Sequence, residues 1–183
     1  MSGWKVFGSR EKRLEEPALL TGLGRFVDDI SFPGMLYAAF VRSSHGHATV
    51  VTIDKEPALA VPGVHAVYTI DEFRPYLNND RLVVGLPSPS YKQELDRPIL
   101  ADGEVVYVGE PIAIVVADTR HVAEDAAALV HVDFDILPAV ADCRAALEKN
   151  APLAHSSSPH NVLAQFDMGY GNEDMVFTNA PQV

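Results

Sequence analysis

Two histidines separated by one glycine, His45 and His47, are the residues whose types and spacing point most directly to chemistry. They lie in RSSHGHATVVTID, residues 42–54, where a polar stretch leads into an apolar run. Residues two apart in a strand face the same side, so both imidazoles could bind one metal ion. Two ligands rarely make a tight site, and the remaining histidines are scattered at His65, His121, His131, His155 and His160. We therefore favour a turn whose ring nitrogens bond backbone carbonyls or water, with a small metal-binding protein as the alternative.

The carboxylate of Glu110 is a second candidate, because it stands between two apolar runs and directly before Pro111. Apolar surroundings raise the pKa of a carboxyl group and can fit it for acid–base chemistry. No paired base or nucleophile is visible beside it. We therefore favour a bulge or edge residue whose carboxylate bonds nearby backbone or an arginine.

Three further motifs carry weaker signals. Cys143 lies beside Arg144, which could lower the pKa of the thiol, but an incidental cysteine fits as well. Gly22-Leu23-Gly24 follows no strand and lacks the third glycine of a dinucleotide loop, so it predicts a turn. Ser156-Ser157-Ser158 before Pro159 predicts a flexible loop, and no G-x-S-x-G nucleophile motif occurs.

Composition bounds the kind of protein. The chain has 183 residues, 48% of them apolar, which is typical of a globular protein with its own core. Its 25 acidic and 14 basic residues give a net charge of −11, which argues against nucleic-acid binding. The sequence has no membrane-spanning run, no basic membrane patch and no signal-peptide pattern, so we expect a cytoplasmic protein without a membrane partner. A single cysteine excludes an internal disulfide and a four-cysteine cluster within these residues.

The elements that must position these candidates are mostly short strands. Runs of β-branched or alternating apolar residues predict strands at 35–42, 48–54, 64–70, 105–109, 111–117 and 131–137. The run 111–117 is apolar throughout, which predicts burial on both faces. The run 131–137 alternates, which predicts a half-buried strand.

Helices are fewer, and they are predicted at residues 55–60, 121–130 and 142–149. Thr119 or Asp118 can cap the second of them. Within that helix Val122, Ala126 and Leu129 recur at helical spacing and are expected to face the core. Together the strands and helices predict an α+β fold, a small mixed β-sheet with a few helices packed on one face.

Residues 72–103 interrupt this pattern. They contain several prolines, asparagines and aspartates and show little periodicity. The stretch is either a long loop or an excursion with short elements, and such stretches are often functional or face a partner.

Four stretches, in this order, resemble one known family. They are LLTGLGRFVDDISFPGMLYAAFVRSSHGHATVVTID at 19–54, ALAVPGVHAVYTIDEF at 58–73, RPILADGEVVYVGEPIAIVVADTRHVAEDAAALVHVDFDILPAV at 97–140, and APLAHSSSPHNV at 151–162. Together they resemble the opening of the large, molybdenum-binding subunit of the xanthine dehydrogenase family. That family includes aldehyde oxidoreductases and aerobic carbon monoxide dehydrogenases. The chain departs from the family pattern at Ser44, Gly46 and Thr49, which puts the geometry of that corner in doubt.

The resemblance implies an N-terminal α/β hammerhead domain at residues 19–150, after an N-terminal segment at 1–18. Residues 151–183 would lead toward the molybdopterin-binding domains. The family's pterin-contacting loops and its general-base glutamate have no counterpart among these residues. The resemblance therefore implies no catalytic, cofactor-binding or metal-binding residue in this chain.

The complete enzyme implied by the resemblance hydroxylates an aldehyde, an N-heterocycle or carbon monoxide, with water as the oxygen source. It would carry the molybdopterin cofactor in the large subunit, with 2Fe–2S clusters and FAD elsewhere in the holoenzyme. The partners implied are the rest of the large subunit, an iron–sulfur subunit and an FAD subunit. A free-standing binding or assembly module without enzyme activity is the alternative, and the substrate is left open.

Overall fold

A computed structural model of the chain describes residues 8, 12–82, 88–93 and 96–180. The chain divides into two units, Met1–Met35 and Leu36–Val183, which are described separately. No helix in the described residues is long and apolar enough to cross a membrane. The predictions made for residues 1–7, 9–11, 83–87, 94–95 and 181–183 lie outside the described residues.

The described part of the first unit contains a short helix and a 3-10 turn. Helix α1 spans Glu16–Leu20, and the turn η1 spans Val27–Asp29. Gly22 has a φ of +72°, the left-handed conformation that commonly ends a helix. A Cβ at Gly24 would lie 2.7 Å from Cδ2 of Leu19, so any larger residue here would require the end of that leucine side chain to shift. The turn predicted for Gly22-Leu23-Gly24 is confirmed.

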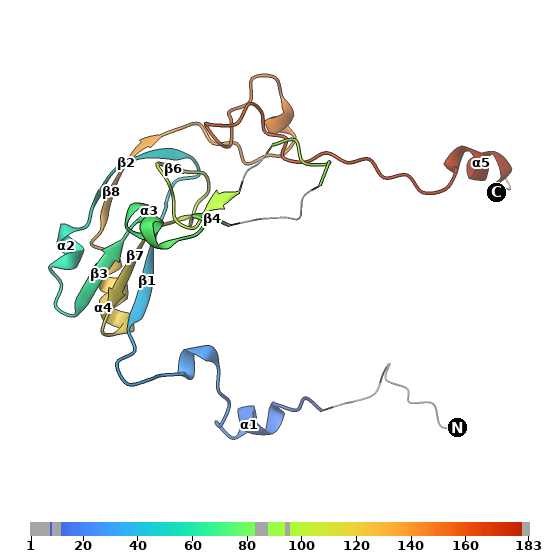
Figure 1. Cartoon of the computed structure of the whole chain (residues 1–183). Helices are drawn as coiled ribbons and strands as arrows, with labels where there is room; N and C mark the ends of the chain where they lie inside the picture. The colour runs from blue at the N-terminus through green and yellow to red at the C-terminus, as the bar shows by residue number, and fades with distance from the viewer. Residues whose placement is uncertain (1–7, 9–11, 83–87, 94–95, 181–183) are drawn as a thin grey trace, which may run out of the picture. The chain divides into compact units, whose positions relative to one another are not determined.

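The second unit is built on two three-stranded antiparallel sheets (Figure 1). Sheet A has the order β1-β7-β3, with β1 at Tyr37–Arg42, β7 at Pro111–Ala117 and β3 at Val64–Tyr68. Sheet B has the order β6-β2-β8, with β6 at Glu104–Val105, β2 at Ala48–Asp54 and β8 at His131–Ile136. A small hairpin-like pair joins β4, Arg81–Leu82, to β5, Arg97–Pro98.

Most strand predictions are confirmed, because apolar patterning and burial coincide. Strand β7 lies at the centre of sheet A, and four of its seven residues are buried. Ala113, Val115 and Ala117 are buried on one face. On the other face Ile112 is buried but Ile114 and Val116 are only half-buried, so the predicted burial on both faces is confirmed only in part. In β8, Val132 and Phe134 are half-buried while the residues between them are exposed, as the alternation predicts.

The strand predicted at 105–109 is wrong beyond Val105. The chain turns through residues 106–109, and Gly109 adopts a φ of +90°. The physical cause is the Glu110 carboxylate, which accepts the backbone N–H of Val106 at 2.6 Å and holds the turn closed. A side chain that bonds local backbone competes in this way with strand formation.

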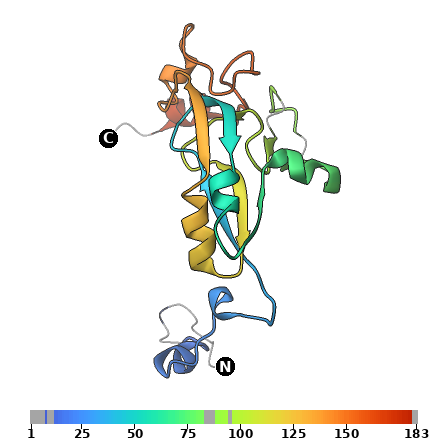
Figure 2. The ribbon, with the colours of Figure 1, turned by 90° about the vertical axis from the view of Figure 1, so that its left-hand side faces the viewer.

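Helix α4, Arg120–Ala127, packs on sheet A (Figure 2). The Thr119 hydroxyl caps it by accepting the N–H of Val122 at 3.2 Å, which confirms one of the two predicted caps. Its buried residues are Ala123 and Ala126, whereas Leu129 is 41% exposed. The predicted apolar face was therefore wrong at Leu129, because α4 ends at Ala127 and Leu129 lies beyond its last turn.

The remaining helical elements are short: α2 at Glu56–Leu59, α3 at Ile70–Phe73, η2 at Arg74–Tyr76, η3 at Ala145–Leu147 and α5 at Glu173–Asn179. The helix predicted at 142–149 is reduced to the single turn η3. Asp142 accepts the N–H groups of Arg144 and Ala145, at 2.7 and 2.9 Å, and this cap supports one turn only. Residues 72–103 form an excursion with short elements as far as they are described.

Two apolar clusters form the core of the second unit. One joins sheet A to α2 and α4 through small side chains, among them Ala58, Val67, Val115 and Ala126. The other joins Ala48, Ala101, Val105 and Ile112 beneath sheet B. Sheets with a few helices packed on them confirm the predicted α+β class.

Candidate functional site

His47, at the start of β2, is buried and binds two acceptors. Its ring Nδ1 lies 3.0 Å from the carbonyl oxygen of Pro138, and its Nε2 lies 2.8 Å from Oε1 of Glu104. Only 5% of the residue is exposed. Both partners accept hydrogen bonds, so both ring nitrogens donate together only when the imidazole is doubly protonated. The backbone bond predicted for the histidine corner is present, and sequence reasoning missed the carboxylate.

His45 lies in a different environment. Its ring meets that of Phe134 edge-on, with centroids 4.8 Å apart and planes at 69°. The corner before it is closed by Ser43, whose hydroxyl donates to the His45 carbonyl at 2.9 Å. The described residues contain no group of three or more His, Cys, Asp or Glu arranged to hold a metal ion. The structure gives each of the two imidazoles its own set of contacts.

Glu104, in β6, is the polar centre of this region. Its Oε1 accepts both the ring of His47 and the backbone N–H of Ser156, the latter at 2.9 Å. Burial alone raises the pKa of Glu104, but the hydrogen bonds from Ser156 and His47 outweigh it and hold this pKa below its ordinary value. One carboxylate thus joins three segments that are far apart in the sequence.

Glu110 is the most buried carboxylate described, with 3% of the residue exposed. Burial raises its pKa, the backbone N–H groups of Val106 and Tyr107 oppose that rise, and the nearby charge of Glu104 adds to it. Its contacts are those of a residue that closes a turn, which is the role favoured from the sequence. The pKa shift alone does not supply a base or nucleophile for catalysis.

A polar cavity of about 640 Å³ lies beside these carboxylates. Its charged lining consists of the acids Asp96, Asp102, Glu104 and Glu110 and the bases Arg81 and Arg97. His155 also lines it, and burial lowers the pKa of that imidazole despite the attraction of Glu104. With His155 neutral, acids outnumber bases, so the cavity disfavours an anionic ligand.

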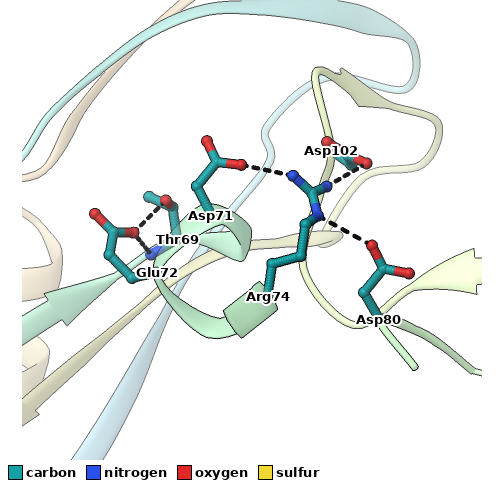
Figure 3. Close-up of polar contacts among 6 residues, drawn as sticks. All are labelled: Thr69, Asp71, Glu72, Arg74, Asp80 and Asp102. Atoms are coloured by element: carbon teal, nitrogen blue, oxygen red, sulfur yellow. Dashed lines mark hydrogen bonds and ion pairs between the residues drawn. The ribbon is translucent and has the colours of Figure 1, made fainter. Parts of the chain in front are cut away.

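A second polar cluster surrounds Arg74 (Figure 3). Its guanidinium contacts three carboxylates: Asp71 through Nη1 at 2.7 Å, Asp80 through Nε at 3.1 Å and Asp102 through Nη2 at 2.8 Å. These contacts, that with Asp102 most strongly, raise the pKa of Arg74. Each of the three guanidinium nitrogens donates to a carboxylate of this chain, so the cluster fastens the excursion together. The charge of Arg74 is thus used within the fold and not to bind a substrate anion.

Glu72 fixes the start of α3 beside this cluster (Figure 3). Both the backbone N–H of Thr69, at 2.7 Å, and its hydroxyl donate to Glu72, and Lys55 forms an ion pair with the same carboxylate. Burial raises the pKa of Glu72, but the bonds from Lys55 and Thr69 lower it to about 2. The arrangement is a helix cap reinforced by a cation.

The other residues singled out from the sequence are Cys143 and the serines 156–158. Cys143 is exposed and forms no disulfide. Ser156 and Ser157 line the cavity, whereas Ser158 is buried and its hydroxyl has no hydrogen-bond partner in the described structure. Sequence reasoning missed Glu104 and Arg74, because their partners lie up to 57 residues away along the chain.

The fold is an α+β domain, and the polar contacts described above mainly fasten its own loops. Residues 21–138 match the family described as aldehyde oxidase and xanthine dehydrogenase, a/b hammerhead domain. The chain belongs to this family, and the predicted hammerhead fold is confirmed.

Several proteins match 80% or more of this chain. The chain is 36% identical to the nicotine 6-hydroxylase large subunit of Paenarthrobacter nicotinovorans, over 97% of this chain and 21% of that subunit. It is 41% identical to the carbon monoxide dehydrogenase large chain of Afipia carboxidovorans, over 80% of this chain and 17% of the relative. Quinoline 2-oxidoreductase from Pseudomonas putida 86 superposes with a TM-score of 0.75 at 39% identity, covering 83% of this chain and 19% of that one. The chain thus spans about a fifth of the length of these proteins.

The molybdenum cofactor associated with this family does not fit the polar groups described here. That cofactor is a phosphate-bearing pterin that binds metal through sulfur, and an acid-rich cavity repels a phosphate. The chain's one cysteine, Cys143, is exposed and cannot supply the thiolates of an iron–sulfur cluster. No reaction step is therefore assigned to these residues.

Proposed function

We propose that this chain serves as the N-terminal structural domain of the large subunit of a cytoplasmic molybdenum-containing hydroxylase. The complete enzyme would be an oxidoreductase acting on an aldehyde, an N-heterocycle or carbon monoxide, with water as the oxygen source. In this proposal the domain, residues 19–150, holds no catalytic residue and is inactive alone. The rest of the large subunit binds the molybdopterin cofactor, and an iron–sulfur subunit and an FAD subunit carry the electrons away.

The observation that carries the proposal is an uncovered apolar face on sheet A. Pairing places Ala38 opposite Val116, which is opposite Ala66, and Phe40 opposite Ile114, which is opposite Tyr68. Residues directly opposite in a sheet share a face, so these six form two rows on one side. We call this set the open face.

The open face lies opposite the helices. The alternate residues of the same strands, among them Val41, Val67 and Val115, pack in the cluster that contains Ala58 of α2 and Ala126 of α4. On the open face, Phe40 is 45% exposed and Tyr68 is 37% exposed. A contiguous apolar face of this kind is typical of a surface that another protein segment covers.

The rest of a large subunit is the occupant that we propose for the open face. The curated relatives place this domain inside subunits about five times its length, so a folded neighbour is present in each of them. Neither row contains an acidic or basic residue, although the Arg42 guanidinium lies 5.1 Å from the centroid of the Phe40 ring, and the ring of Phe73 lies 5.1 Å from that of Tyr68. The apolar composition of the rows suits a permanent interface, with Arg42 at its rim. The free-standing module remains the second candidate function.

Two experiments test the proposal. First, the purified chain is analysed for molybdenum and assayed for turnover of aldehydes, N-heterocycles and carbon monoxide with a dye acceptor. We expect neither bound metal nor turnover, and stoichiometric molybdenum with turnover would refute the claim that the chain is inactive alone.

The second experiment replaces the matching fifth of the Afipia carboxidovorans large chain with this chain. We expect the chimera to assemble and bind molybdenum, and Phe40→Asp with Ile114→Asp to abolish assembly. The matched control is Leu129→Asp, an exposed leucine just beyond α4, away from the open face. A chimera that folds but never assembles would instead favour the free-standing module, and full assembly of the double variant would exclude the open face as the interface.

A further inference from the structure

Residues 151–165 follow the last strand and consist mainly of loop, yet they are tied to distant parts of the unit. Their end pairs with the excursion: the N–H of Lys92 donates to the carbonyl of Leu163, and that of Gln165 donates to the carbonyl of Ser90, both at 2.9 Å. Tyr91 and Ala164 form an antiparallel bridge between these two bonds. The two irregular stretches of the chain therefore lie side by side.

Side-chain amides hold the middle of the same stretch. Asn161 donates to the carbonyls of Ala146 and Pro152, at 3.0 and 2.8 Å, and accepts the N–H of Ala154 at 2.8 Å. Gln93 donates to the carbonyls of residues 160 and 162, at 2.8 and 2.9 Å. The loop therefore has a defined path although it has no regular secondary structure.

The beginning of the stretch is attached to sheet B through the carboxylate of Glu104. The backbone N–H of Ser156 donates to its Oε1 atom, and the buried ring of His47 contacts the same oxygen from the other side. Beside this bond, His155, Ser156 and Ser157 form one wall of the polar cavity.

We infer that residues 151–165 form a strap that belongs to the domain and closes the polar cavity, and that Glu104 is the latch that holds the strap on sheet B. The region matched to the hammerhead family ends at residue 138, so the strap lies outside it. The inference extends the domain proposed above, residues 19–150, to residue 165, and it is otherwise independent of the proposed function because it concerns contacts within this chain.

We assign the latch to Glu104 and not to the side-chain amides of Gln93 and Asn161. The bond from Ser156 to Glu104 is charge-assisted, and the buried His47 ring holds the same carboxylate in place. Hydrogen bonds to an ionised acceptor are the stronger kind. The side chain of Glu104 is 22% exposed and that of His47 is 5% exposed, so water competes little for the shared oxygen. His47 contacts this carboxylate directly, and the other titratable or charged groups that line the cavity with it are Arg81, Asp96, Arg97, Asp102, Glu110 and His155.

Amide hydrogen exchange of the full 183-residue chain tests the latch. In Glu104→Ala, we expect the Ser156 amide to exchange at least about tenfold faster, since a bond to a charged group is lost. The amides of β7 should keep their protection. The matched control is Asp135→Ala, which removes an exposed acid from β8 of the same sheet and should leave the Ser156 amide unchanged.

A second variant, Glu104→Gln, covers the case in which the alanine variant unfolds. The amide oxygen can still accept the N–H of Ser156, so we expect a smaller acceleration. Protection of Ser156 should weaken with acid in the wild type and not in Glu104→Gln, after correction for the intrinsic exchange rate. Wild-type protection at Ser156 in a folded Glu104→Ala, or unchanged acid dependence in Glu104→Gln, would overturn the inference.

Discussion

Replacing Glu110 tests the role of the most buried carboxylate. Glu110→Ala removes the acceptor of two backbone N–H groups, that of Val106 at 2.6 Å and that of Tyr107. Each donor left without a partner inside the protein costs about 1–3 kcal/mol, so two would cost about 2–6 kcal/mol. Because Tyr107 is 38% exposed and water can replace the carboxylate there, we expect a loss of about 2–4 kcal/mol in the free energy of unfolding. Glu110→Gln keeps the volume and one acceptor oxygen, and we expect it to cost about 1 kcal/mol or less at neutral pH.

The pH dependence separates the charge of Glu110 from its hydrogen bonds. Burial raises its pKa in the folded chain above the unfolded value of about 4.3. The stability from this shift is therefore fully present below about pH 4.3 and is lost as pH rises through the folded pKa. We expect Glu110→Gln to gain stability relative to the wild type as pH rises from about 4 to 8, because glutamine carries no charge to bury.

Urea unfolding followed by far-ultraviolet circular dichroism, at a series of pH values, measures both effects. Glu124→Gln, on the exposed side of α4, is the matched control and should stay within about 0.5 kcal/mol of the wild type. Two results would contradict the reasoning. One is an alanine variant at Glu110 as stable as the wild type, and the other is a glutamine-to-wild-type difference that does not change with pH.

Two further residues give independent predictions. Glu72 has a pKa of about 2, since the bonds from Lys55 and Thr69 outweigh its burial. The stability that comes from this lowered pKa is present above about pH 4.3 and is lost as pH falls toward 2. Thermal unfolding between pH 2 and 5 should therefore depend less on pH in Glu72→Gln, and an unchanged slope would count against the cap. Thr119→Ala removes the cap of α4 and should cost about 1 kcal/mol in urea unfolding, whereas Thr119→Ser should retain most of it; equal losses in both would exclude the hydroxyl as the cause.

The strands could be predicted because each is specified by its own residues. The run 48–54 coincides with β2, and the run 111–117 coincides with β7. The turn at residues 106–109 could not be predicted. Their composition is typical of a strand, but the Glu110 side chain accepts the N–H of Val106 and holds them in a turn. The exposed Leu129 was placed in the core for a different reason: helical spacing was continued to residue 130, but the helix ends at Ala127, so Leu129 does not follow its period.

The contacts of Glu104 and Arg74 could not be predicted, because their partners are distant in the sequence. Glu104 meets its partners His47 and Ser156 across 57 and 52 residues of sequence. Arg74 likewise meets Asp102 across 28 residues. No local pattern marks such pairs, so a single sequence offers the residue types without their partners. The hydrogen-bonded corner at His47 could be expected, and the carboxylate that completes it could not.

The distribution of aromatic residues adds a separate argument about what this domain does. Among the described residues, the buried apolar core consists of Ala, Val, Leu and Ile side chains and contains no aromatic one. Aromatic side chains bury the largest areas and dominate both cores and interfaces. Here Phe40 and Tyr68 lie on the open face, outside the core. Phe134 is half-buried against the core, but a domain whose core is otherwise aliphatic and that leaves Phe40 and Tyr68 at the surface still has apolar area to bury. This distribution supports its proposed place as a scaffold within a larger subunit.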